Sequence, residues 1–216
     1  MDFIDRSYTF GEELFNSVSH GAGALLSIGG AAVLIVFAAI YGGALTVAAC
    51  SVYALTLIIL YSMSLVYHLI SEKHEKAKAL FKALDNSSLY LIVAGTYTPY
   101  ALCCLKGAQG WIVFGIIWLA AVVGMTLTWI FKRSRRVVAT CYIILGWSII
   151  IALEAFRLSM PTISLVFLIL GGAFYMGGLV FYNYKNLHYM HSIWHLFVIA
   201  GSIFHYFSIF YAVVKF

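Results

Sequence analysis

The sequence consists almost entirely of long apolar runs separated by short polar segments. Crossing the hydrocarbon core of a bilayer takes about 20 predominantly apolar residues in a helix. Because backbone groups in lipid must be satisfied within their own segment, runs this long and apolar must be helical. We therefore expect an all-α integral membrane protein, a single seven-helix transmembrane bundle over residues 1–216. The spans are predicted near residues 17–41, 45–70, 86–105, 110–131, 137–157, 161–183 and 188–213.

Composition excludes most other classes of protein. Apolar residues make up 63% of the chain and charged residues 10%, whereas a soluble domain is roughly half apolar and a quarter charged. A soluble enzyme, a disordered chain and a nucleic-acid-binding module are therefore excluded. The acidic, polar start does not have the pattern of a signal peptide. The four cysteines lie in apolar runs without a C-x-x-C pair and are expected to pack in the core: Cys50, Cys103, Cys104 and Cys141.

The distribution of basic residues predicts the orientation, since Lys and Arg concentrate in cytoplasmic loops. With the N-terminus inside, the inner side holds ten of the 13 Lys and Arg residues. They are Arg6, Lys73, Lys76, Lys78, Lys82, Lys132, Arg133, Arg135, Arg136 and Lys185. We expect a cytoplasmic N-terminus and an outer C-terminus, in a bacterial inner membrane. The basic segment 71–85 is interpreted either as a helix along the inner interface or as a solvated loop.

Two prolines mark positions in the predicted spans. Pro161 starts the sixth span, where a missing N–H has no cost. Pro99 lies within the third span and is expected to kink it.

Histidines within the spans require an explanation, because placing an ionisable side chain in the hydrocarbon core raises the free energy of the protein. His191 and His195 are four residues apart and share a helix face, a spacing that suits zinc. Taken alone, the spacing is a weak signal for a metal, and the alternative is a pair of histidines hydrogen-bonded to neighbouring helices. The predicted topology brings His68, at the end of span two, and Asp85, at the start of span three, to the same leaflet. This agreement favours zinc, although Asp85 is also a good helix N-cap.

Further polar residues surround these positions. Ser64 shares a face with His68, and its hydroxyl could hold the ring or a water, or bond back to the carbonyl of Leu60. Near the start of span one, Glu13, Asn16, Ser19 and His20 could surround the metal ligands or simply anchor the first helix. Whether His20 or His188 serves as an alternative ligand stays open. Glu154 and Arg157 are expected to form an ion pair at the outer end of span five.

Together these motifs resemble the hemolysin III family of the progestin and adipoQ receptor (PAQR) superfamily, which is related to alkaline ceramidases. The residues that carry the resemblance are Glu12-Glu13-Leu14 with Asn16 and Ser19-His20, Ser64-x-x-x-His68, Asp85, the segment Ala94-Gly95-Thr96-Tyr97-Thr98-Pro99, and His191-x-x-x-His195. The resemblance covers nearly the whole chain. It implies seven helices with the N-terminus inside and a zinc ion near the cytoplasmic leaflet. The implied ligands are His68, His191 and His195, with Asp85 holding a water ligand and Ser64 beside it.

Such a site predicts hydrolysis of an amide or ester bond in a membrane lipid, as in a ceramidase. Zinc with three imidazole ligands can activate water near neutral pH. Asp85 would act as general base, and Ser64 would stabilise the oxyanion. Two alternatives stay open: a non-catalytic sensor or receptor of membrane state with a structural zinc, and a cytolytic hemolysin. Membrane lipids are the expected partners in each case, within membrane-lipid homeostasis.

Overall fold

The computed structural model describes residues 7–105, 107–131, 135–148, 153–184 and 187–214. Within these residues the chain is all helical and has no strand. The helices are α1 (Phe10–Tyr41), α2 (Ala44–Leu69), α3 (Glu75–Pro99), the π-helix η1 (Tyr100–Cys104), α4 (Ala108–Phe131), α5 (Arg135–Trp147), α6 (Leu153–Ser159), α7 (Thr162–Asn183) and α8 (Met190–Val213).

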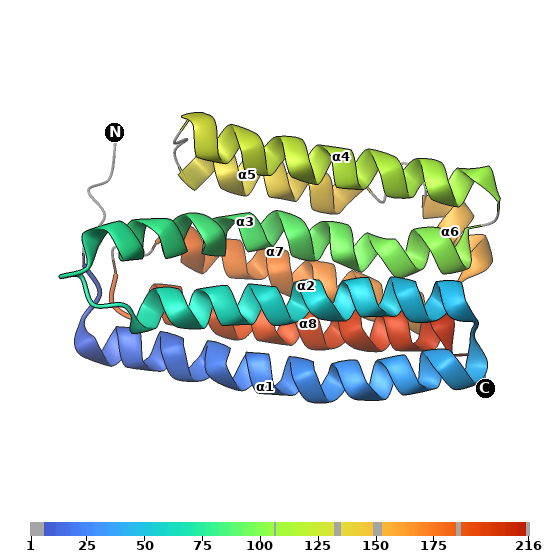
Figure 1. The fold of residues 1–216 in the computed structure, drawn as a ribbon, viewed down its shortest axis with the longest axis horizontal. Helices are drawn as coiled ribbons and strands as arrows, with labels where there is room; N and C mark the ends of the chain where they lie inside the picture. Colours follow the sequence, from blue (N-terminus) through green and yellow to red (C-terminus); the bar gives the residue numbers. More distant parts are fainter. Residues whose placement is uncertain (1–6, 106, 132–134, 149–152, 185–186, 215–216) are drawn as a thin grey trace.

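The helices run alternately up and down one long axis (Figure 1). α1 packs on α2, α2 on α3, and α7 on α8, while α4 and α5 form an outer layer against α3. α1 begins at one end of the bundle and α8 finishes at the other (Figure 1). Five helices of the described part are long and apolar enough to cross a membrane: α1, α2, α4, α7 and α8. Many of their large apolar side chains face outward, as a lipid environment requires.

The first helix begins earlier than the span predicted at residue 17. Thr9 is its N-cap, and its hydroxyl accepts a hydrogen bond from the backbone N–H of Glu12 at 3.3 Å. The Glu12 carboxylate in turn accepts from the backbone N–H of Thr9 at 2.9 Å, which completes a capping box. Glu12 and Glu13 therefore lie in the first turn of α1, a favourable place for negative charge.

The third helix corrects two expectations. It begins at Glu75 and not near residue 86, so segment 75–84 is neither a separate interfacial helix nor a solvated loop. Its alanines, leucines and lysines are strong helix formers. Asp85 consequently lies inside the helix and is not an N-cap.

Pro99 ends α3, and a π-helix follows it directly. Proline cannot donate a hydrogen bond to the carbonyl four residues earlier, here that of Gly95. The helix then continues with wider turns, and the backbone N–H of Leu105 donates to the carbonyl of Tyr100 at 3.3 Å. The expected irregularity at Pro99 thus takes the form of a short π-helix directly after the proline.

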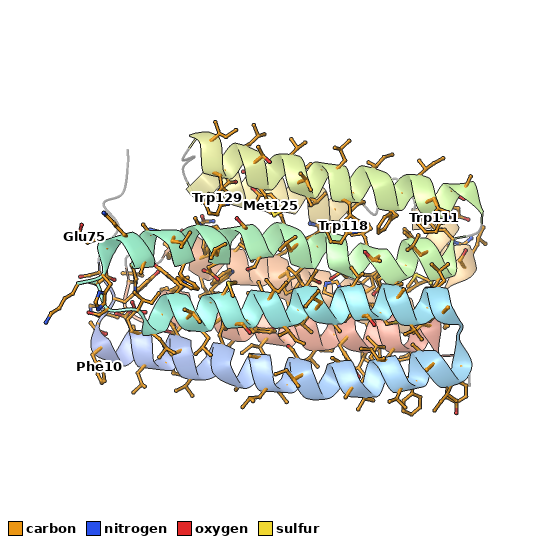
Figure 2. All side chains as sticks on the ribbon, in the orientation of Figure 1. Phe10, Glu75, Trp111, Trp118, Met125 and Trp129 are labelled. Carbon is orange, nitrogen blue, oxygen red and sulfur yellow. The ribbon has the colours of Figure 1, made fainter. Side chains whose placement is uncertain are left out.

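The fifth predicted span, 137–157, contains two helices, α5 and α6, and residues 149–152 between them lie outside the described residues. Side chains of α4 tie this outer layer to α3. The indole N–H of Trp118 donates to Thr98 at 3.0 Å, and that of Trp129 to Ser87 at 2.8 Å. Figure 2 shows both tryptophans between the two helices. Glu154 and Arg157 form the expected ion pair, 2.7 Å long and exposed.

The four cysteines form no disulfide bond, and Cys50 and Cys104 are buried in the core. Small residues allow close contact between neighbouring helices. A Cβ atom at Gly23 of α1 would lie 2.6 Å from the Tyr61 ring of α2, whereas a Cβ atom at Gly29 would meet nothing within 4 Å.

We expect Gly23→Ala to destabilise the bundle by about 1–3 kcal/mol, because the added methyl group collides with the Tyr61 ring. Thermal unfolding of the purified protein in detergent, followed by circular dichroism, measures the effect. Gly29→Ala is the matched control on the same helix and should leave the midpoint unchanged or slightly raised. Equal midpoints for the two variants would contradict this description of the α1–α2 contact.

Candidate metal centre

Residues far apart in the sequence meet at the end of the bundle where α1 begins. α2 ends there, α3 begins there, and α8 begins there as well (Figure 1). Phe10 and Glu75, the first residues of α1 and α3, are both labelled at this end in Figure 2. The last turn of α2 therefore faces the first turns of α8 and α1.

Three buried histidines form the centre of the site. Each of His68, His191 and His195 offers one ring nitrogen, and these three atoms lie within 4.8 Å of one another. The Nε2 atoms of His191 and His195 are 3.1 Å apart, as the i, i+4 spacing on α8 predicts. This buried group could hold a metal ion, and it consists of the three residues proposed as ligands.

The orientation of His68 is fixed by a carboxylate from α1. The Nδ1 atom of His68 lies 2.5 Å from Oε2 of Glu13. A carboxylate acceptor favours the tautomer with its proton on Nδ1, which leaves Nε2 with a lone pair for a metal. Nε2 of His68 is buried and has no hydrogen-bond partner among the described residues.

Glu13 is itself held by Lys78, a buried residue of α3. The Lys78 ammonium group donates to Oε1 of Glu13 at 2.8 Å and to the carbonyl of Ile70 at 3.1 Å. It also lies 3.3 Å from Glu72 and 4.6 Å from the centre of the Tyr67 ring. A continuous series of contacts thus runs from Lys78 through Glu13 to His68. The basic segment alone gave no sign that one of its lysines would be buried.

Two further contacts join α1 to the start of α8. The hydroxyl of Ser192 donates to Oδ1 of Asn16 at 2.7 Å, directly beside His191. The backbone N–H of Tyr189 donates to the carboxylate of Glu12 at 2.7 Å. Ser19, by contrast, donates to the carbonyl of Asn16 in its own helix and makes no hydrogen bond to the histidines in the described part of the chain.

His20 lies against one member of the histidine group, His195. Its ring stacks on that of His195, with centroids 3.6 Å apart and an angle of 18° between the planes. Both of its nitrogens are buried without a hydrogen-bond partner among the described residues. His188 is exposed and precedes α8, away from the three converging nitrogens.

Asp85 and Ser64 lie next to each other beside the histidines. The Asp85 carboxyl group interacts electrostatically with His68 and lies beside the Ser64 hydroxyl. Ser64 is fully buried, and its hydroxyl makes no hydrogen bond of good geometry, so the bond to the Leu60 carbonyl is not formed. The carboxyl group and the hydroxyl therefore lie side by side next to the histidine group.

Tyr8 covers the group from the N-terminal side. Its ring stacks on His191 at a centroid distance of 5.1 Å and lies 5.9 Å from the His68 ring. No spacing rule connects a residue before the first helix to histidines on α2 and α8, so the sequence gave no sign of this contact.

A small apolar cavity of about 30 Å³ lies between α2, α3, α7 and α8. Trp194, which precedes His195 in the sequence, is one of the residues that line it. Its lining residues are Leu60, Leu89, Ile92, Val93, Tyr175, Trp194 and Val198.

Comparison with known proteins confirms the resemblance. A family described as haemolysin-III related matches residues 8–206. Hemolysin-3 of Bacillus cereus is 38% identical over 204 residues, covering 94% of this chain and 92% of that protein. A Hemolysin-3 homolog of Bacillus subtilis (strain 168) is 35% identical over 209 residues, covering 96% and 97%. The human monocyte to macrophage differentiation factor is 27% identical over 163 residues, covering 73% and 67%. The chain belongs to the haemolysin-III related family.

Proposed function

We propose that the chain is a zinc-dependent membrane protein of lipid homeostasis that hydrolyses an amide or ester bond of a membrane lipid. One observation carries the proposal. The three buried histidines converge beside a carboxyl group, Asp85, and a hydroxyl, Ser64.

The donor set fits zinc. Zinc in proteins takes nitrogen ligands at about 2.0–2.1 Å in a tetrahedral arrangement, so that two ligand nitrogens lie about 3.3 Å apart. The two α8 nitrogens, 3.1 Å apart, are close to that separation. His68 presents Nε2, and its Nδ1 is bonded to Glu13, the pattern of a carboxylate-supported ligand. Three neutral imidazoles would leave the fourth position of a catalytic zinc open.

The residues around the ligands have separable roles in the proposed reaction. Zinc held by three imidazoles supplies a Lewis acid that activates water near neutral pH. Asp85 accepts the proton of the attacking water and returns it to the leaving amine or alkoxide. Ser64 donates a hydrogen bond to the carbonyl oxygen as negative charge develops on it. Lys78 and Glu13 hold the His68 ring in place.

We propose that all seven predicted spans cross the membrane, with α3 as the third and α5 with α6 as the fifth. The site would then lie at the cytoplasmic leaflet of a bacterial inner membrane, at the end that carries Lys73, Lys76 and Lys82. A site at headgroup depth beside an apolar cavity suits a ceramide-like lipid or a phospholipid better than a soluble substrate.

A second candidate function is a non-catalytic sensor of membrane state, in which the zinc ion has the structural role of joining helices. The positions of the three histidines favour it, because one ion would join α2 to α8, and Glu13 of α1 is bonded to His68. The names of the Bacillus relatives suggest lysis of cells. For this chain, spans with almost no charge do not resemble the lining of a water-filled pore.

We expect about one zinc per chain in the purified protein and its loss in the double variant His191→Ala, His195→Ala, because one imidazole cannot hold the ion alone. Elemental mass spectrometry measures the content. His188→Ala, which removes an exposed histidine, should retain the metal. A folded protein without zinc would refute the metal centre and the hydrolase with it.

Glu13→Gln should lower zinc affinity by about 10–100-fold, because a neutral amide supports the His68 ring less well than a carboxylate. Competition with a fluorescent zinc chelator gives the affinity. Lys78→Met should have an effect of the same sign, since Glu13 then loses its cation. Glu75→Gln, at an exposed carboxylate in the first turn of α3, is the control. Unchanged affinity in Glu13→Gln would remove Glu13 from the site.

Asp85→Asn should lower lipid hydrolysis by about 10²–10⁴-fold and leave the zinc content unchanged, because an amide cannot accept the proton. Release of fatty acid from ceramides and phospholipids in mixed micelles measures turnover, with zinc analysis of the same samples. If the native protein retains zinc and turns over none of these lipids, the structural-zinc sensor becomes the better account.

A further inference from the structure

One aromatic ring from outside the helices lies over the histidine group. Tyr8 precedes Thr9, the N-cap of α1, and its backbone is not helical. Its ring stacks on the ring of His191, with 5.1 Å between the centroids and 22° between the planes. The same ring lies 5.9 Å from the ring of His68. A single side chain thus contacts a histidine of α2 and a histidine of α8.

The exposure of Tyr8 differs from that of its aromatic neighbours. Three further rings that contact His68 or His191 belong to helices and are buried: Tyr67 of α2, Tyr182 of α7 and Trp194 of α8. Tyr8 is only half-buried. Its ring therefore has the histidines on one side and retains surface that faces away from the protein, which is the arrangement of a cover.

The segment that carries Tyr8 is anchored by the buried carboxylate of Glu12. This carboxylate accepts a hydrogen bond from the backbone N–H of Thr9 at 2.9 Å. It also accepts one from the backbone N–H of Tyr189, the N-cap of α8, at 2.7 Å. One side chain therefore fixes both the residue after Tyr8 and the start of the helix that carries His191.

The start of α8 is shaped to meet this anchor. Tyr189 has a φ of 60°, a left-handed conformation that is uncommon for a bulky residue and needs support from its surroundings. The hydrogen bond to Glu12 supplies such support. A Cβ atom at residue 11 would lie 2.8 Å from the phenolic oxygen of Tyr189, so glycine at this position lets the Tyr189 side chain lie close to α1.

The place of Tyr8 in the fold decides which side of the histidine group it covers. α1 begins at the end of the bundle where the last turn of α2 and the first turn of α8 meet (Figure 1). Tyr8 lies two residues before this start. A group that approaches the histidines from water at this end of the bundle therefore meets the Tyr8 ring.

We propose that Tyr8 is a movable closure of the metal centre, and that displacement of its ring opens the route by which a metal ion enters and leaves. Segments outside helices move more readily than packed helices, and displacing Tyr8 requires no helix to shift. Displacing Tyr67 or Trp194 would require repacking of buried helix contacts. The inference rests on the metal centre of the proposed function and is independent of lipid hydrolysis.

A closure and a residue that supports the bound ion have different kinetic signatures. A ring that only blocks the route slows entry and exit by the same factor, so the dissociation constant, which is the ratio of the two rate constants, does not change. A residue that stabilises the bound ion slows exit alone. Measurement of both rates therefore separates the two roles.

The test uses the full chain in detergent micelles. Transfer of zinc from the loaded protein to an excess of a chromophoric chelator gives the rate of exit. Uptake of Zn²⁺ by the metal-free protein, followed with a fluorescent zinc indicator, gives the rate of entry. Tyr8→Ala should raise both rates by about tenfold, as expected when one stacked aromatic pair no longer has to be broken, and leave the dissociation constant unchanged.

Two variants serve as controls. Tyr8→Phe retains the ring and should exchange zinc at the native rates. Phe10→Ala removes an aromatic ring that is 84% exposed, two residues further along the chain, and should also have no effect. Circular dichroism shows whether each variant is folded, and Tyr8→Ser, with the same expected result, replaces Tyr8→Ala if that variant does not fold.

A second measurement needs no metal. Diethyl pyrocarbonate modifies accessible imidazole groups, and mass spectrometry of the metal-free protein gives the rate at each histidine. His191 should react about tenfold faster in Tyr8→Ala than in the native protein or Tyr8→Phe, for the same reason as zinc exchange. The exposed His188 is the internal reference and should react equally in all three.

The outcomes separate the closure from the metal centre itself. Equal reaction of His191 in the native protein and Tyr8→Ala would overturn the closure. Faster exit of zinc with unchanged entry would overturn it as well, because Tyr8 would then support the bound ion. A native protein that binds no zinc would refute the proposed metal centre, and the reaction of His191 alone would then decide whether Tyr8 closes the histidine group.

Discussion

The bundle depends on polar side chains that find partners across helix interfaces. Lipid is as apolar as leucine, so burial of apolar surface gives two helices little reason to choose one relative position over another. A hydrogen-bonded polar pair fixes the relative position of two helices, because separating the pair leaves both groups without water or a partner. The bond from Ser192 to Asn16 and the contact of Glu13 with His68 thus set how α1 lies against α8 and α2.

The early start of α1 makes these contacts available. With a helix beginning near residue 17, Glu12 and Glu13 would lie in an irregular segment without a defined direction. The capping box at Thr9 extends the helix by two turns, so that Glu12 reaches the backbone of Tyr189 and Glu13 reaches His68. A local interaction of three residues thereby supports a site built from four helices.

The sequence predicts the three histidines well, but it predicts poorly the residues that hold them in place. His191 and His195 follow from the period of the helix, and His68 follows from topology. Lys78 contacts a residue 65 positions away, and nothing in a lysine-rich segment distinguishes the one lysine that is buried. The start of α3 was misplaced for a related reason. Hydropathy locates the membrane boundary, whereas a helix of alanine, leucine and lysine continues beyond it into the headgroup region.

Buried polar groups in the described part of the chain fall into two kinds. Ser87 with Trp129, and Ser164 with Ser208, are bonded and join helices. Nε2 of His68 and both ring nitrogens of His20 are buried without a hydrogen-bond partner among the described residues, and they lie at the candidate metal centre. Each such atom lowers the stability of the fold by about 1–3 kcal/mol. A bound ligand that supplies the missing partner offsets this loss. A metal ion bound by the three histidines would give Nε2 of His68 the partner that it lacks.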